Sequence, residues 1–423
     1  MAKNKLLRNT LFLYLMTFSN QLINLITIPY QTRVLGPVIY GKISVAASLM
    51  MYVQLIMDFG FLLSATEKVS RNRHDADYNS RLFTTVTAVK VVLGLTAGAL
   101  LWGVCGAIEA LRVDRTLYMF YYLAYVVSAL LPDFVYRGQE EMQTVTIRTV
   151  LIRAGFASLM LVFVREPGDY LRLPLLLLIG NAAAVVFSFW HVKKIFNVTF
   201  RVPDRGFVMQ IVRDTVPFFV SRISITFYQA LNALILGVKF AGQAVIGYYG
   251  SADKLLGIAR SFSSPVADSL YPHMVHNKDY RIIRKLLMLV MPVILAGAVV
   301  VFWQAEWICM LLFGEEYAAA GNILRCLLPA MIVTFPSYIL SFPTLNPIGL
   351  SGYANFSNVV GCAVMLVQLG ILFAGGWVNV YTLCIASSIS EVTVCAFRAA
   401  VAWKYRGRMQ GEGWAEIFLK NTK

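Results

Sequence analysis

The feature that most constrains this chain is the recurrence of long apolar runs. A helix needs about 20 mostly apolar residues to cross a bilayer core, and only helices and closed barrels satisfy their backbone groups there. The sequence therefore predicts an all-α polytopic membrane protein. We predict twelve transmembrane helices, at about 10–30, 43–63, 82–107, 116–136, 145–164, 171–192, 214–237, 245–271, 286–312, 320–342, 355–375 and 380–402.

Composition agrees with a membrane protein. Of the 423 residues 58% are hydrophobic and only 14% are charged, and the mean hydropathy is +0.66. The net charge of +15 favours basic cytoplasmic loops over a nucleic-acid partner in such a chain. Roughly 22 Lys and Arg residues fall at the termini and in the connections after even-numbered spans, against roughly 7 elsewhere, which predicts that both termini are cytoplasmic.

A pair of glycines recurs in the sequence. Gly36 and Gly41 join the first two spans, and Gly242 and Gly247 join spans 7 and 8, each pair at an offset of 206 (242 − 36 and 247 − 41). Chance recurrence of glycine-rich turns is the alternative to a duplication. The matching span numbers favour a parallel repeat. The long basic connection near the midpoint then divides the chain into two six-helix bundles, residues 1–200 and 201–423.

Polar side chains gather on spans 1, 2, 7 and 8, which correspond under this duplication. In span 1, Asn20 and Asn24 belong to a narrow polar stripe, and Asp58 lies on a broad polar face of span 2. We expect these faces to line a central water-filled cavity. Hydrogen bonding between helices is the alternative, and it suffices for the single Ser and Thr residues.

Charges within spans need a stronger explanation. An ionised side chain at bilayer depth costs at least ~2.5–3.5 kcal/mol unless it faces protein or water. We therefore expect Arg222, Lys254 and Arg260 to reach the cavity, with Asp253 paired to one of these cations.

Further charges leave their roles open. Lys90, about 12 Å into span 3, either lines the cavity or extends its ammonium to the membrane surface. Arg153 presents the same choice, and Arg148 is expected near a helix end with its guanidinium extended to the membrane surface. Glu391, on one face with Arg398, either carries a coupling proton or pairs with a basic group on another helix.

The motifs exclude several chemistries. The sequence has no phosphate-binding glycine loop of the nucleotide-hydrolysing type, and its six cysteines and four histidines form no metal-binding pattern. We expect no enzyme activity, no cofactor and no metal. A basic cavity with apolar walls suits an amphiphile with an anionic head, because Arg and Lys bind phosphate oxygens. Rocking of the two halves would give alternating access.

Two blocks carry a resemblance to a known family. Leu25–Gly41 (LITIPYQTRVLGPVIYG) with Asp58–Thr66 (DFGFLLSAT), and Pro217–Ile223 with Ile246–Leu255 (IGYYGSADKL) and Ser264–Pro272, closely resemble the Wzx-type polysaccharide flippases. The resemblance becomes diffuse from about residue 285. Asp253-Lys254 stands where relatives more commonly carry Glu-Lys, which changes reach but keeps charge.

This resemblance implies a fold and an activity. It implies twelve helices in two bundles of six, like other multidrug/oligosaccharidyl-lipid/polysaccharide exporters, around a cavity lined by spans 1, 2, 7 and 8. It implies movement of undecaprenyl-pyrophosphate-linked oligosaccharide repeat units, for O-antigen or capsule, to the outer face of the bacterial inner membrane. Arg222 and Lys254 would hold the pyrophosphate or acidic sugars. Glu391 and Asp58 are the candidates for proton or sodium coupling, and a polymerase and chain-length regulator are expected partners.

Three alternatives remain open at this point. A cation-coupled drug antiporter on the same fold would favour an acidic cavity, whereas spans 7 and 8 carry more Arg and Lys than carboxylates. A lipid II-type flippase would carry two additional helices. A repeat-unit polymerase would need substantial periplasmic loops, and the outer connections are short.

Overall fold

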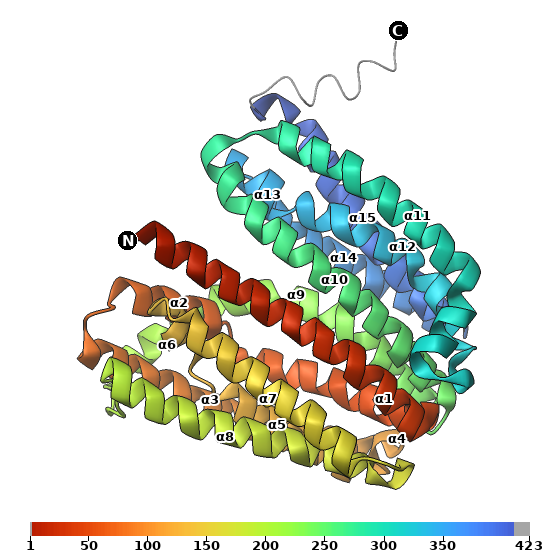
Figure 1. Ribbon diagram of the computed structural model, residues 1–423, viewed down its shortest axis with the longest axis horizontal. Coiled ribbons are helices and arrows are strands. Elements are labelled where there is room, and N and C mark those ends of the chain that lie inside the picture. Colours follow the sequence, from red (N-terminus) through yellow and green to blue (C-terminus); the bar gives the residue numbers. More distant parts are fainter. Residues whose placement is uncertain (1, 410–423) are drawn as a thin grey trace. The chain divides into compact units, whose positions relative to one another are not determined.

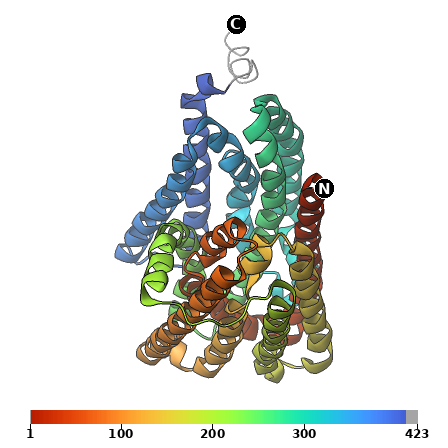
Figure 2. The ribbon, with the colours of Figure 1, turned by 90° about the vertical axis from the view of Figure 1, so that its left-hand side faces the viewer.

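The computed structural model describes the backbone of residues 2–409. Side chains are described in this range except at residues 2–7, 9–10, 217, 220–222, 224–225, 227–229, 272, 276–277 and 408. The described chain consists of helices and their connections, without a strand. It forms two compact units, residues 1–247 and 248–423 (Figures 1 and 2). The division into six-helix bundles at residue 200 is a different boundary and stays a prediction.

The N-terminal unit is built from nine α-helices, of which α3, α5, α7 and α8 are long and lie alongside one another (Figure 1). The helices are α1 (Ala2–Asp58), α2 (Phe61–Arg71), α3 (Ala76–Ala107), α4 (Glu109–Arg112), α5 (Arg115–Ala129), α6 (Asp133–Gly138), α7 (Met142–Phe163), α8 (Arg172–Phe196) and α9 (Arg205–Lys239).

Helix α1 is interrupted at Gly36, where φ is 70° and ψ is 169°. Glycine reaches this conformation without a Cβ penalty, and Pro37 then removes a backbone donor. Figure 1 shows the chain turning back after the first half of α1. On either side of the break, Tyr30 donates to the carbonyl of Val164 at 2.7 Å and Lys42 binds Asp114 at 2.7 Å. Spans 1 and 2 are thus the two arms of α1.

A second break follows Asp58. Phe59 and Gly60 both have positive φ, 44° and 84°, and α2 then begins. Helix α9 packs directly on this break, because the rings of Phe59 and Phe219 stack at 4.6 Å and a Cβ on Gly60 would lie 2.7 Å from Cβ of Phe218. The break places the Asp58 carboxylate at a helix end inside the unit.

The two glycines at an offset of 206 meet in the structure. A Cβ built on Gly41 would lie 3.0 Å from the backbone nitrogen of Gly247, and one built on Gly247 would lie 1.9 Å from the carbonyl oxygen of Pro37. Residues related by a two-fold axis contact each other where the axis passes. The duplication itself stays a prediction.

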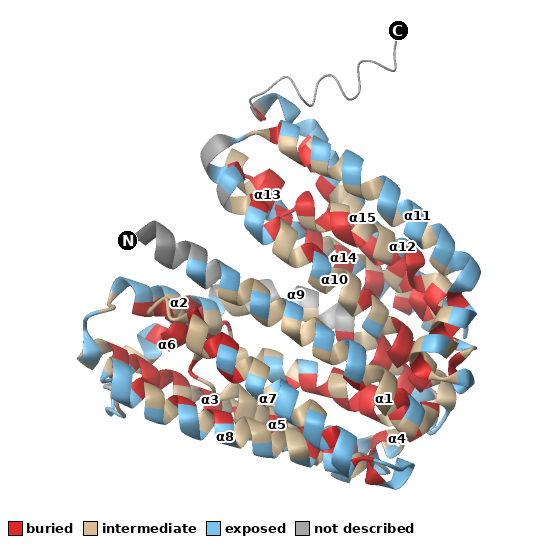
Figure 3. Cartoon of the chain, in the orientation of Figure 1, coloured by how far each residue is buried: buried red, intermediate tan, exposed pale blue. Residues whose placement is uncertain are grey.

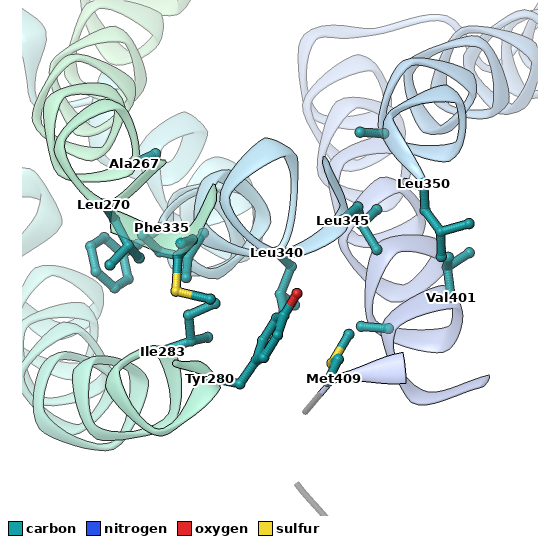
Figure 4. Packing of buried hydrophobic residues seen from close by; sticks show 14 residues of the cluster. Ala267, Leu270, Tyr280, Ile283, Phe335, Leu340, Leu345, Leu350, Val401 and Met409 are labelled. Atoms are coloured by element: carbon teal, nitrogen blue, oxygen red, sulfur yellow. The ribbon is translucent and has the colours of Figure 1, made fainter. Parts of the chain in front are cut away.

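The C-terminal unit begins within α10 and continues with helices α11, α12, α14 and α15 and a short α13. The helices are α10 (Ala244–Asn277), α11 (Tyr280–Phe313), α12 (Ala320–Ile339), α13 (Phe342–Leu345), α14 (Ser351–Ala374) and α15 (Val380–Lys404). Figure 4 shows the cluster of buried side chains that joins α10, α11, α12 and α15, with Tyr280 and Met409 beneath them.

Nine stretches of the described residues are long and apolar enough to cross a membrane. One of them, Leu11–Arg71, contains both arms of α1. Helices α9 and α10, with 35 and 34 residues, each have side chains outside the described set. The class of fold, an all-helical polytopic membrane protein, is confirmed, whereas the count of twelve spans stays a prediction. Figure 3 shows many exposed residues along the outer helices, as lipid contact requires.

Candidate functional site

A hollow of about 340 Å³ within the N-terminal unit is lined by three charged side chains. Asp58 at the end of α1, Lys90 in α3 and Asp133 at the start of α6 line it. Uncharged residues complete the wall: Met51, Gln54, Leu55, Leu62, Ser128, Ala129, Leu131 and Thr226. The hollow thus combines polar groups that can bind a ligand with an apolar wall that limits water.

Lys90 has only 7% of its surface exposed. Its Nζ donates to the carbonyl oxygen of Ala129 at 2.7 Å. Ala129 is the last residue of α5, where carbonyls lack helical partners and carry the negative end of the helix dipole. The carboxylates of Asp58 and Asp133 also attract the ammonium group. Lys90 therefore faces the hollow and does not extend to the membrane surface.

Asp133 is held by an arginine that does not itself line the hollow. Nη2 of Arg148 contacts Oδ1 of Asp133 at 2.5 Å, and Nη1 donates to Oγ of Ser188 at 2.8 Å. Arg148 lies near the start of α7, but its side chain is only 4% exposed, so the expected extension of its guanidinium to the membrane surface was wrong. We did not single out Asp133 from the sequence. Its position, directly after Pro132 inside a predicted span, was the available signal.

The polar stripe of α1 faces the inside of the unit. Thr27, on the stripe, is 5% exposed, whereas the opposite side of the helix presents exposed apolar residues: Leu11, Leu15, Phe18, Leu22 and Ile26. Oδ1 of Asn20 is buried and has no hydrogen-bond partner among the described residues. Asn24 is half-buried, and Arg153 in the middle of α7 is exposed. None of these three residues lines the charged hollow.

The C-terminal unit joins two residues that the sequence analysis treated separately. Nη2 of Arg260 on α10 contacts Oε1 of Glu391 on α15 at 2.8 Å. The side chains are 20% and 10% exposed. A basic residue on another helix was one of the two expected roles of Glu391, and the structure shows that contact. It does not test proton coupling.

Arg398 lies two turns after Glu391 and is enclosed by polar groups. Its guanidinium donates to Oγ of Ser357 at 2.8 Å, to the carbonyl and hydroxyl of Ser337 at 2.9 and 2.8 Å, and to Oδ1 of Asn358 at 2.9 Å. This network ties α12, α14 and α15 together, and it keeps the arginine in place beside the Arg260–Glu391 pair.

The remaining candidates stay separate. Asp253 is half-buried and Lys254 is exposed. Arg260 and Lys254 both attract the Asp253 carboxylate, but among the described residues Asp253 has no ion pair, because Arg260 binds Glu391 instead. Arg222 belongs to α9, and its side chain lies outside the described residues.

Comparison with known proteins identifies the family. Residues 6–278, more than half of the chain, match the family described as polysaccharide biosynthesis protein. The chain belongs to this family. A curated protein of Shigella dysenteriae, named "Putative O-antigen transporter", is 24% identical over 384 residues, which cover 88% of this chain and 94% of that protein. A protein of the same name from Escherichia coli strain K12 is 24% identical over 275 residues, which cover 64% of this chain and 65% of that protein. The resemblance to Wzx-type flippases is confirmed.

Solved structures show the fold of this polysaccharide biosynthesis protein. An inward-facing multidrug resistance MATE family transporter of the MOP superfamily gives a TM-score of 0.72 at 15% identity and covers 93% of this chain and 95% of that one. The lipid II flippase MurJ, in an inward closed conformation, gives a TM-score of 0.73 at 11% identity. The match covers 92% of this chain and 87% of that one. At these identities the likeness concerns the fold alone, and it confirms the MATE-like class.

Proposed function

We propose that this chain is a flippase for polysaccharide precursors. Its substrate is an undecaprenyl-pyrophosphate-linked oligosaccharide repeat unit, and it moves the unit across the bacterial inner membrane by alternating access. The names of the curated relatives and the transporter fold support this proposal.

The observation that carries the proposal is the placement of Lys90. An ammonium group inside a transmembrane helix costs ~2.5–3.5 kcal/mol or more, so such residues are characteristic of substrate and ion pathways. Lys90 lines a hollow together with two carboxylates. Arg148 contacts Asp133 from outside the hollow. The charges of Lys90 and Arg148 therefore balance those of Asp58 and Asp133. A polar or charged group that enters the hollow then meets preformed partners of either sign.

The C-terminal unit supplies the coupling step in this proposal. Arg260 is neutralised by Glu391. Protonation of Glu391 would weaken its contact with Arg260 in favour of an anionic head, and loss of the proton would restore that contact and favour release of the anion. Asp58 is a second position for a coupling proton or sodium ion. Arg222 and Lys254 remain candidates for contact with the pyrophosphate or acidic sugars.

The rest of the proposal concerns the setting. Both termini are cytoplasmic, the protein performs no covalent chemistry, and it works with the polymerase and chain-length regulator that take the exported repeat unit. A cation-coupled drug antiporter and a lipid II-type flippase are the alternatives on this fold. We favour the oligosaccharide substrate because both curated relatives that match the chain are named as O-antigen transporters.

Complementation tests the proposal. The gene is placed in a strain that lacks its own repeat-unit flippase but makes the repeat unit, and the surface glycan and the sidedness of the lipid-linked unit are measured. We expect the wild type to restore export. Lys90→Met should reduce export at least tenfold, because it removes the ammonium and keeps a side chain of similar length.

Lys193→Met is the matched control, since Lys193 is an exposed lysine near the end of α8. It should export like the wild type at equal membrane levels. Full export by Lys90→Met would remove the role given to this residue. No export by the wild type, with the repeat unit shown to accumulate inside, would favour the drug-antiporter alternative, and cation efflux would be measured next.

A further inference from the structure

A second hollow, of about 390 Å³, lies between α10, α11 and α12 of the C-terminal unit. Its wall includes Ala259, Gly297, Ala298, Met331 and Phe335. The only hydroxyl in the lining is that of Ser263, which donates to the carbonyl of Ala259 at 2.8 Å. The hollow therefore offers an apolar surface and no polar group in need of a partner.

Small residues on α11 create this hollow. A Cβ added to Gly297 would meet no atom within 4 Å. None of the most apolar 18-residue stretch of α11 is buried, and Figure 3 shows exposed residues along this helix. Protein interiors are close-packed because unfilled space loses dispersion contacts. In a membrane this groove is filled by hydrocarbon.

The groove has one polar end. Arg325 lies one turn before Leu328, and Phe302 directly follows Val301, where Leu328 and Val301 are groove residues. Nε of Arg325 donates to the carbonyl of Phe302 at 3.0 Å, and Nη1 binds Glu306 at 2.7 Å.

The guanidinium of Arg325 keeps capacity for a further ligand. Nη1 also contacts Oδ1 of Asn322 at 2.5 Å, but no described residue accepts a hydrogen bond from Nη2. The side chain is 26% exposed. Glu306 and Asn322 thus fix a planar guanidinium near the end of the apolar groove. Glu306 formally balances its charge, and the N–H donors of Nη2 remain for phosphate oxygens.

We propose that this groove binds the isoprenoid chain of a polyprenyl-phosphate-linked lipid, with its phosphate end toward Arg325. The proposal rests on the proposed function, because it names where the lipid part of that substrate lies. The groove follows α11 from Val290 to Val301, roughly 16 Å at 1.5 Å per residue. Its volume is near the lower end of ligand pockets, so it accommodates one chain segment, and the gap above Gly297 admits a methyl branch.

Binding by the purified full-length protein tests this inference. Geranyl phosphate and undecaprenyl phosphate are compared in detergent, for example by native mass spectrometry. We expect undecaprenyl phosphate to bind at least ~10-fold more tightly. Gly297→Leu fills the groove and should abolish this difference. Gly370→Leu is the matched control, because Gly370 is an exposed helical glycine with no atom within 4 Å of an added Cβ, and it should keep the difference.

The head-group contact has a separate readout. Arg325→Gln should weaken the binding of undecaprenyl phosphate several-fold. It should leave unchanged the binding of undecaprenol, which lacks the phosphate. The groove assignment is wrong if the wild type binds geranyl phosphate and undecaprenyl phosphate equally well. It is also wrong if Gly297→Leu keeps the wild-type difference between them. If phosphatidylglycerol competes as effectively as undecaprenyl phosphate, the groove binds ordinary membrane lipid, and the assignment is again wrong.

The test does not depend on transport. If Gly297→Leu does not purify as a folded protein, Ala259→Leu fills the groove from α10 and is judged by the same comparison. If the protein prefers the long chain but fails complementation, the groove assignment stands and the proposed function is rejected. Complementation that survives without chain-length dependence would do the reverse.

Discussion

At the scale of single residues, Arg148 and Asp133 form a pair whose members depend on each other. The Arg148 side chain is 4% exposed and contacts Asp133 at 2.5 Å. Removing one partner of a buried pair leaves an uncompensated charge at a cost of about 3–5 kcal/mol, whereas replacing both with apolar residues is often neutral. Arg148→Met should therefore destabilise the protein strongly, and Arg148→Met with Asp133→Leu should recover part of the loss, because Asp133 also attracts the ammonium group of Lys90.

Thermal unfolding in detergent measures this pair. Arg213→Met, at an exposed position of α9, should leave the midpoint unchanged. A double variant as unstable as Arg148→Met would show that the arginine acts through Ser188 and not through Asp133.

Arg398 gives a second prediction at this scale. Its guanidinium donates hydrogen bonds to the side chains of Ser337, Ser357 and Asn358. Each buried acceptor left without a donor lowers the free energy of unfolding by about 1–3 kcal/mol. Arg398→Leu should lower the unfolding midpoint clearly. Arg398→Lys should recover only part of it, because an ammonium group cannot reproduce the geometry of a planar fork. Full stability of Arg398→Leu would contradict this account.

At the scale of elements, the close approach of α10 to the turn of α1 depends on Gly247. An added Cβ would lie 1.9 Å from the carbonyl oxygen of Pro37, so the helix must move to accept any other residue. We expect Gly247→Ala to cost about 1–3 kcal/mol or more, as overpacking does. Gly257→Ala is the control, because an added Cβ there meets nothing within 4 Å.

The yield of folded, membrane-inserted protein and its melting temperature measure the effect. Equal values for Gly247→Ala and Gly257→Ala would show that the two helices are not held at this distance in the membrane.

At the scale of the whole molecule, the distribution of Lys and Arg predicts the orientation in the membrane. A green fluorescent protein fused to the C-terminus should fluoresce, and alkaline phosphatase fused there should be inactive. Phosphatase inserted between α4 and α5, after Val113, should be active, because that connection follows an odd-numbered span. The opposite pattern at both positions would invert the predicted topology.

The sequence predicted the charged side chains better than it predicted their partners. Glu391 had two possible roles from the sequence, and its contact with Arg260, 131 residues away, became visible only in the folded unit. Lys90 likewise had two possible directions until α5 was seen to end at its ammonium group. The side chain of Arg148 was expected at the membrane surface because its distance from the end of a predicted span says nothing about which helix covers it.

The sequence by itself determined the class of this protein, its repeated glycine turn and the spans that carry charge. These properties depend on hydropathy and local backbone freedom, which neighbouring residues set. Only the tertiary structure decided the charge partners, the hollow around Lys90 and the groove beside Gly297. Each of these depends on which faces of distant helices meet, and side-chain size and packing settle that choice.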